Sequence, residues 1–208
     1  MTTRKSGKRP YHHGNLAESL LDAVDELATR FGLEAVSLRG CARLVGVAPS
    51  SAFRHYADKR ALLTAFATRA LTQLSEAMEA ARVRAEQTGG DTLRAVGLAY
   101  VEFAIDKPAF FRAMWHQEAI YSNDPEYLAA ANRLSQHLMG GFADTIADEN
   151  PESFSPQELL AWSAVHGLAS LLVDGPVAKG ESRERKMTQA AEMLGAMGPV
   201  FRAPRQSG

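Results

Sequence analysis

Cysteine is almost absent from this sequence, which has Cys41 as its only one among 208 residues. A single thiol cannot close a disulfide within the chain, so the composition fits a reducing cytoplasm. Long apolar runs are missing too, because none approaches the roughly 20 residues that cross a bilayer. The stretch 1–15 carries basic residues but no apolar segment of a secretory signal. The sequence therefore predicts a cytoplasmic protein without a membrane partner.

The motifs of common enzyme classes are missing as well. The chain has no G-x-S-x-G elbow, no phosphate-binding loop, no H-E-x-x-H and no paired-carboxylate signature. His116, Glu118, His137 and His166 could in principle assemble a metal site, but their spacing matches no local ligand motif. We therefore expect no enzymatic activity, no cofactor and no metal. A metal-responsive regulator that uses these C-terminal histidines stays open as the alternative.

Charge is scarce in total but unevenly distributed. The net charge is −1, yet residues 1–60 hold ten Lys/Arg and six Asp/Glu, a net +4, while the other 148 residues carry −5. This asymmetry indicates a basic module that meets a polyanion and an acidic body that does not. Part of the positive charge lies in residues 1–14, a basic arm that we expect to be flexible. The arm either follows a minor groove of DNA or stays in solvent.

Residues 15–60 have the pattern of short helices joined by tight turns. Asn15 is a good cap for a first helix, and Ser37 caps a second one that Gly46 ends. Pro49 opens a third helix, and Asp58 caps a long fourth one. Two short helices joined by a turn and packed on a longer first helix form a helix-turn-helix unit.

The rest of the chain is also helical in pattern, with proline and glycine between the periodic segments. The breaks fall at residues 87–91, 107–108, 124–125, 155–158 and 175–176. We therefore predict an all-α protein with an N-terminal three-helix helix-turn-helix DNA-binding domain at 15–60. A larger C-terminal helical ligand-binding and dimerisation domain follows at 61–202, and residues 203–208 form a frayed tail.

The third predicted helix has the chemistry of a recognition helix. Its first turn is small, so it can approach base edges closely, and Ser50 and Ser51 can bond to a base or a phosphate. Phe53 offers an apolar face to a thymine methyl, and Arg54 can reach a guanine or a phosphate. Lys59, at the start of the next helix, suits a phosphate.

This stretch resembles the tetracycline-repressor (TetR) family of bacterial transcriptional regulators. The shared pattern is S-L-R-x-x-A-R-x-x-G-V-A-x-x-x-x-x-R-H-Y-x-D-K-x-A-L-L, from Ser37 to Leu63. A weaker match, W-x-x-x-H-G from Trp162 to Gly167, resembles one type of C-terminal domain in that family. The resemblance implies contact with double-stranded DNA by Ser37, Arg39, Ser50, Ser51, Phe53, Arg54, His55, Tyr56 and Lys59.

The resemblance also implies a homodimer on a palindromic operator, repression by default, and release by a small effector. The last two long helices offer small and apolar residues for a dimer seam: Ala161, Trp162, Val165, Leu168, Ala169, Leu172, Met187, Ala190, Leu194 and Met197. Aromatic and methionine side chains between the two ends of the chain suit a mainly apolar effector pocket: Phe103, Phe110, Phe111, Met114, Trp115, Tyr121, Met139 and Phe142. Bound to its operator, such a regulator is found on the nucleoid.

Overall fold

The computed structural model describes residues 16–140, 154–175, 177 and 179–201, and every regular element in them is a helix. The α-helices are α1 Leu16–Phe31, α2 Leu38–Val45, α3 Pro49–His55, α4 Lys59–Thr88, α5 Thr92–Asp106, α6 Pro108–Trp115, α7 Pro125–Gly140, α8 Pro156–Val173 and α9 Arg183–Phe201. Two short 3-10 turns, η1 Leu33–Ala35 and η2 Gln117–Ala119, complete the path. The expected all-α fold is confirmed. The predicted arm, the Asn15 cap, Phe142 and the tail lie outside the described residues.

Side-chain caps explain where the helices begin. Ser37 accepts a hydrogen bond from the Gly40 amide at the start of α2, and Asp58 does the same for the Ala61 amide in α4. Ser155 and Glu158 form a capping box at the start of α8. Each cap pairs amide donors that the first helical turn leaves without a partner, a contribution of about 1 kcal/mol. The helix starts read from the sequence are confirmed at these positions.

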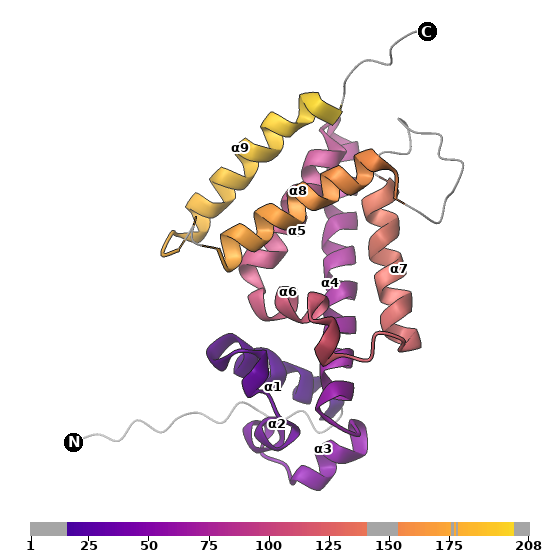
Figure 1. Ribbon diagram of the computed structural model, residues 1–208, viewed down its shortest axis with the longest axis vertical. Helices are drawn as coiled ribbons and strands as arrows, with labels where there is room; N and C mark the ends of the chain where they lie inside the picture. The colour runs from indigo at the N-terminus through magenta and orange to yellow at the C-terminus, as the bar shows by residue number, and fades with distance from the viewer. Residues whose placement is uncertain (1–15, 141–153, 176, 178, 202–208) are drawn as a thin grey trace, which may run out of the picture.

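The helices α1, α2 and α3 form one end of the molecule, and α5 to α9 form the other (Figure 1). The 30-residue helix α4 joins the two ends and is about 45 Å long. It packs against α5, α6 and α7, while α5 also packs against α8 and α9. The domain boundary predicted at 60/61 therefore falls within the first turn of a helix that serves both ends.

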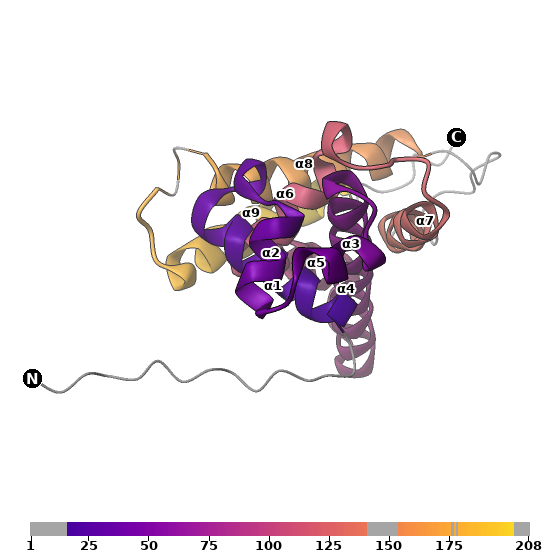
Figure 2. The same cartoon turned by 90° about the horizontal axis from the view of Figure 1, so that it is seen from below.

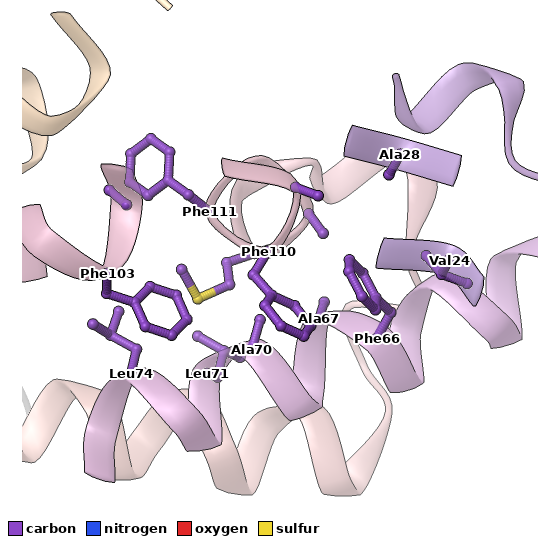
Figure 3. Packing of buried hydrophobic residues seen from close by; sticks show 14 of the residues in the cluster. Val24, Ala28, Phe66, Ala67, Ala70, Leu71, Leu74, Phe103, Phe110 and Phe111 are labelled. Carbon is purple, nitrogen blue, oxygen red and sulfur yellow. The ribbon is translucent and has the colours of Figure 1, made fainter. Parts of the chain in front are cut away.

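The core runs without interruption from α1 to α5 along one side of α4 (Figure 3). Phe66 of α4 stacks on Phe110 of α6 with ring centroids 4.4 Å apart, and Phe103 of α5 stacks on Phe110 from 6.3 Å. Val24 and Ala28 bring α1 into the same cluster. The end formed by α1, α2 and α3 is thus packed directly on the body, and no separate linker joins the two.

Glycine lets three helices of the body meet at one point. A Cβ atom added to Gly97 of α5 would lie 3.3 Å from Leu194 of α9 and 3.5 Å from Val165 of α8. A side chain at this crossing would force Leu194 to shift by a few tenths of an ångström, so glycine allows the closest packing here.

Two large apolar residues near the ends of α1 and α2 face solvent. Phe31 is 61% exposed and Leu44 is 43% exposed. Phe31 is the last residue of α1, and the chain turns at Gly32 (φ 83°) directly after it, so its ring extends beyond the packed face. The guanidinium of Arg30 lies over this ring, 5.1 Å from its centroid.

Candidate nucleic-acid interface and effector groove

The turn between α2 and α3 fixes the angle of a helix-turn-helix. Gly46 ends α2 in the left-handed region (φ 82°), where its amide donates to the Ala42 carbonyl. Cys41, Ala42 and Ala52 are completely buried between the helices. Small buried residues let α2 and α3 pack closely, and they leave the other face of α3 to solvent.

That outer face of α3 carries the predicted recognition side chains. Ser50, Phe53, Arg54 and His55 are exposed, and Ser51 is half-buried. Phe53 keeps 45% of its surface exposed, although nearby α1 and α4 bury rings and leucines fully. The guanidinium of Arg54 donates to the Ser51 hydroxyl at 3.1 Å, which holds it along the helix. Figure 2 views this end of the molecule, where α2 and α3 lie side by side. This face offers donors, one cation and one apolar ring to a groove.

Three of the predicted DNA-contact residues also hold the domain together. Ser37 caps α2, and Lys59 donates from Nζ to the Glu34 carbonyl at 2.8 Å. The Tyr56 hydroxyl donates to the Ala17 carbonyl of α1 at 3.4 Å, and burial raises the pKa of this phenol to about 12. Arg39 is exposed on α2. Contact of all nine residues with DNA stays a prediction.

An open groove of about 550 Å³ lies between the DNA-binding end and the body. Both parts of the chain line it: the end of α1 with η1, then α6, then α8. The lining residues are Phe31, Gly32, Leu33, Glu34, Phe111, Arg112, Trp115, His116, His166, Ser170 and Asp174. The Arg112 guanidinium donates from Nε to the Asp174 carboxylate at 2.9 Å and closes one edge. Its size suits a small organic molecule.

A histidine within an aromatic cluster forms part of this groove. The Tyr100 hydroxyl lies 2.9 Å from His166 Nδ1, and Tyr100 is 1% exposed. The ring centroids of Trp115, Phe111 and Trp162 lie 5.0, 5.5 and 6.5 Å from the imidazole centroid. Burial lowers the pKa of His166, so the imidazole is neutral at pH 7. His166 is thus held by a hydrogen bond inside the body, and it also lines the groove.

The structure brings together only part of the predicted effector set. Phe111 and Trp115 line the groove. Three others are packed core residues of α5 and α6: Phe103, Phe110 and Met114. Tyr121 instead donates to the Asp58 carboxylate at 2.7 Å. Met139 lies in α7, but its side chain, like Phe142, is outside the described part. The predicted set includes two residues that line the groove, and it did not separate lining residues from core residues.

Groove residues from the DNA-binding end were missed from the sequence: Phe31, Glu34 and their neighbours. Gly32 was the sequence feature that could have revealed Phe31. The glycine ends α1 directly after this apolar residue, which leaves the Phe31 ring at the open end of the helix. Arg112 and Asp174 were also missed, since an ion pair between residues 62 apart in sequence has no local pattern.

Most of the predicted dimer residues are buried within the chain itself. Six of the ten have at most 8% of their surface exposed: Ala161, Leu168, Ala169, Leu172, Ala190 and Leu194. Trp162 packs on Trp115 and Phe154, and Val165 packs beside Gly97. These side chains hold α8 and α9 on α5, so they are not free to contact a second copy, and a dimer through these two helices stays a prediction. The exposed apolar residues on these two helices are Leu159, Leu160, Leu171 and Met193.

The histidines considered for a metal site do not converge. His116 lies 3.8 Å from Glu34, His137 lies 3.5 Å from Glu79, and His166 contacts Tyr100. In the described ranges no three His, Cys, Asp or Glu side chains come together in a way that could hold a metal ion. Among the same residues, no helix combines the length and apolar character that crossing a membrane requires.

A helix-turn-helix with an exposed outer face on α3, joined to an all-helical body with a groove, defines the class of helix-turn-helix transcriptional regulators. Two family models match the chain: "Bacterial regulatory proteins, tetR family" over residues 20–66, and "Tetracyclin repressor-like, C-terminal domain" over residues 93–194. The chain belongs to the TetR family and is a DNA-binding transcriptional regulator. The finer W-x-x-x-H-G assignment of its C-terminal domain stays a prediction.

Solved structures share this fold along nearly the whole chain. A protein of unknown function from Rhodococcus sp. RHA1 is 26% identical, with a TM-score of 0.68 over 90% of this chain and 97% of that one. The regulator PfmR from Thermus thermophilus is 20% identical, with a TM-score of 0.61 over 90% and 96%. The regulator LfrR from Mycobacterium smegmatis, solved with proflavine, is 19% identical, with a TM-score of 0.58 over 86% and 95%.

Proposed function

We propose that this chain is a repressor that binds a palindromic operator as a homodimer and is released by a small, mainly apolar effector. It acts in the cytoplasm and lies on the nucleoid when bound. The observation that carries this proposal is the outer face of α3, where Phe53 and Arg54 are exposed beside Ser50. An exposed ring and an extended guanidinium on a seven-residue helix have little structural use, and both fit a major groove.

A single α3 helix covers too little DNA for specific recognition, so a second copy is needed. Two-fold dimers of such domains read half-sites about 34–36 Å apart. Two stripes run along α8 one residue apart. The stripe at Ala161, Val165, Leu168 and Leu172 packs into the chain, and the stripe at Leu160, Ala164, Gly167 and Leu171 faces away from it.

This outward stripe suits a helix of the second copy. A Cβ atom added to Gly167 would meet nothing within 4 Å, so a partner helix can approach closely there. Leu160 and Leu171 are 54% and 47% exposed, and Met193 of α9 is 38% exposed. We assign the dimer seam to this face in place of the residues predicted from the sequence. The self-complementary surface of a two-fold dimer uses the same residues on both copies.

The groove supports release by an effector, because its walls come from both ends of the chain. A ligand between η1 and α8 contacts the DNA-binding end and the body at once, so it can favour one angle between them. Such coupling between sites amounts to about 1–3 kcal/mol. The structurally similar LfrR was solved with proflavine, an aromatic molecule, which supports an aromatic ligand for this groove.

Footprinting on the DNA that flanks the gene tests the proposal. The expected result is two protected windows about one helical turn apart, with binding that weakens steeply as salt rises. Protection of no bases at low salt would contradict the DNA-binding role. Protection of a single window by a monomer would contradict the dimer.

A further inference from the structure

We infer that the groove takes a neutral aromatic compound that carries a carbonyl group, and that the Nε2–H of His166 is the donor that selects it. This inference rests on the proposed effector role of the groove. It names the chemistry of the effector, which neither the family nor the fold determines.

The two ring nitrogens of His166 face different surroundings. Nδ1 is within 2.9 Å of the Tyr100 hydroxyl, on the buried side. Within the described residues Nε2 makes no hydrogen bond, and the His166 side chain is only half-buried. Because His166 lines the groove, the edge with Nε2 is the one that a ligand meets.

Tyr100 fixes which nitrogen of His166 carries the proton. The pKa of the phenol is raised by its burial, so Tyr100 keeps its proton and can donate it to Nδ1. The indole nitrogens Trp115 Nε1 and Trp162 Nε1 are buried without an acceptor, and both lower the pKa of Tyr100 by their proximity to its oxygen. In the part of the chain that the structure describes, Nδ1 of His166 is the one hydrogen-bond partner of the Tyr100 hydroxyl, so the phenol proton points toward it. His166 then presents Nε2–H to the groove, and its ligand must be an acceptor.

The walls of the groove favour an aromatic molecule. Phe31, Phe111 and Trp115 present rings to it, and Phe31 has most of its surface free. Stacked and edge-to-face pairs of aromatic rings stabilise a complex by about 0.5–1.5 kcal/mol beyond the burial of their area. An aromatic ligand in this groove would also displace water from the exposed ring of Phe31.

Charge in the groove argues against an ionised ligand. Its one guanidinium, on Arg112, is paired with Asp174, and Glu34 adds a second carboxylate at the rim. The low pKa of His166 leaves it without charge. A carboxylate ligand would therefore meet two acids and no free guanidinium. A cationic ligand would find only Glu34, whose side chain is 86% exposed and screened by water. A neutral carbonyl oxygen suits the neutral imidazole N–H of His166, and the hydroxyl of Ser170 in the same lining is neutral too.

Three probes of one shape test this reading on the full chain. They are 2-acetylnaphthalene, 2-ethylnaphthalene and 2-naphthoate, which differ only in the group that meets His166. Binding is followed by NMR, using the indole N–H signals of the only two tryptophans, Trp115 and Trp162. We expect the ketone to bind about fivefold to tenfold more tightly than the hydrocarbon, the effect of one neutral hydrogen bond. We expect naphthoate to bind more weakly than the ketone. Equal affinity for ketone and hydrocarbon, or tightest binding of naphthoate, would overturn the inference.

Variants assign the effect to His166. His166→Leu should abolish the preference for the ketone, and His166→Gln, which keeps a side-chain N–H, should retain part of it. Tyr100→Phe tests the positioning role through the imidazole nitrogen shifts of His166, which should change from one tautomer to a mixture. An unchanged preference in His166→Leu, or unchanged imidazole shifts in Tyr100→Phe, contradicts the inference. Gel shifts on the same preparations report the proposed function separately, because DNA binding without probe does not depend on the ligand's chemistry.

Discussion

The Tyr121 hydroxyl donates a 2.7 Å hydrogen bond to the Asp58 carboxylate and so ties the loop after η2 to the start of α4. The other carboxylate oxygen of Asp58 caps α4 by accepting from the Ala61 amide. The Arg60 guanidinium lies over the Tyr121 ring, 4.6 Å from its centroid, and donates to the Ile120 carbonyl. The junction that follows the recognition helix is therefore clamped to the body by a few polar contacts.

Tyr121→Phe should weaken this clamp. The variant loses one hydrogen bond to a carboxylate at an exposed site, so we expect a small loss in the free energy of unfolding at pH 7. The pKa of Asp58 lies below its ordinary value of 3.8, first because of the Ala61 amide and then because of Tyr121. Its contribution is therefore present above pH 3.8 and is lost as pH falls toward the lower folded-state pKa. Urea denaturation from about pH 7 to about pH 3 should show a smaller acid loss in the variant than in the wild type. An equal loss of unfolding free energy at low pH in both proteins would contradict the role of Tyr121 in lowering the pKa of Asp58.

Arg54→Ala should reduce operator affinity without affecting folding. The side chain is exposed and bonds only to Ser51 in the described structure, so its removal leaves the core intact. Loss of one base or phosphate contact corresponds to about 1–3 kcal/mol in binding. Gel shifts measure the affinity, and thermal melting checks the fold. Arg133→Ala on α7 is the matched control, because it removes an exposed arginine far from α3. If the two variants bind equally well, Arg54 is not a DNA contact.

Leu160→Asp and Leu171→Asp should separate the dimer and leave the subunit folded. Each removes an apolar side chain that we place in the seam, about 1.5–3 kcal/mol per buried leucine. Leu128→Asp on α7 changes a leucine of similar exposure, 44%, away from this face, and should stay dimeric. Sedimentation velocity distinguishes the outcomes. A dimer that survives both α8 substitutions moves the interface elsewhere.

Leu168→Ala should act on the subunit and not on the seam. Leu168 is 8% exposed and belongs to the core that joins α8 to α5, so its truncation should lower the free energy of unfolding by about 2–5 kcal/mol. Chemical denaturation of this variant, compared with Leu171→Ala, measures the difference. A larger loss in Leu171→Ala than in Leu168→Ala would mean that the two stripes of α8 have been exchanged, and a small loss in Leu168→Ala would contradict its place in the core.

Acid should destabilise the protein in part through His166. Burial lowers its folded-state pKa below the ordinary 6.5, so the unfolded chain binds the proton more tightly. The free energy of unfolding therefore falls as pH drops below 6.5, down to the folded-state pKa. His166→Gln removes this term, so the stability of the wild type relative to the variant should decrease between about pH 7.5 and about pH 5.5. A constant difference would show that His166 titrates alike in both states.

The sequence predicted the helices well because their ends are determined locally. Ser37, Asp58, Ser155 and the prolines at 49, 108, 125 and 156 act within one turn of the chain, so spacing alone revealed them. The recognition face was visible for the same reason. The face of α8 was not, since the stripes at Leu168 and Leu171 are both apolar. Only the packing of α5 decides which stripe turns inward.

The groove could not be read from the sequence because it forms between distant segments. Phe31 and His166 are 135 residues apart and belong to different predicted domains. The pair of Tyr100 and His166 likewise joins two helices whose relation depends on the missing side chain at Gly97.

The unbroken helix α4 has a mechanical consequence for regulation. Because its first turn follows the recognition helix directly and its middle lies under α6, it behaves as a stiff lever. A tilt of about 5° about its middle would carry the tip, about 22 Å away, by about 2 Å. In a symmetric pair both tips would move, and the distance between them would change by up to twice that amount. A small ligand bound near the middle of α4 could therefore change the distance between the two recognition helices, so that it no longer matches one turn of DNA.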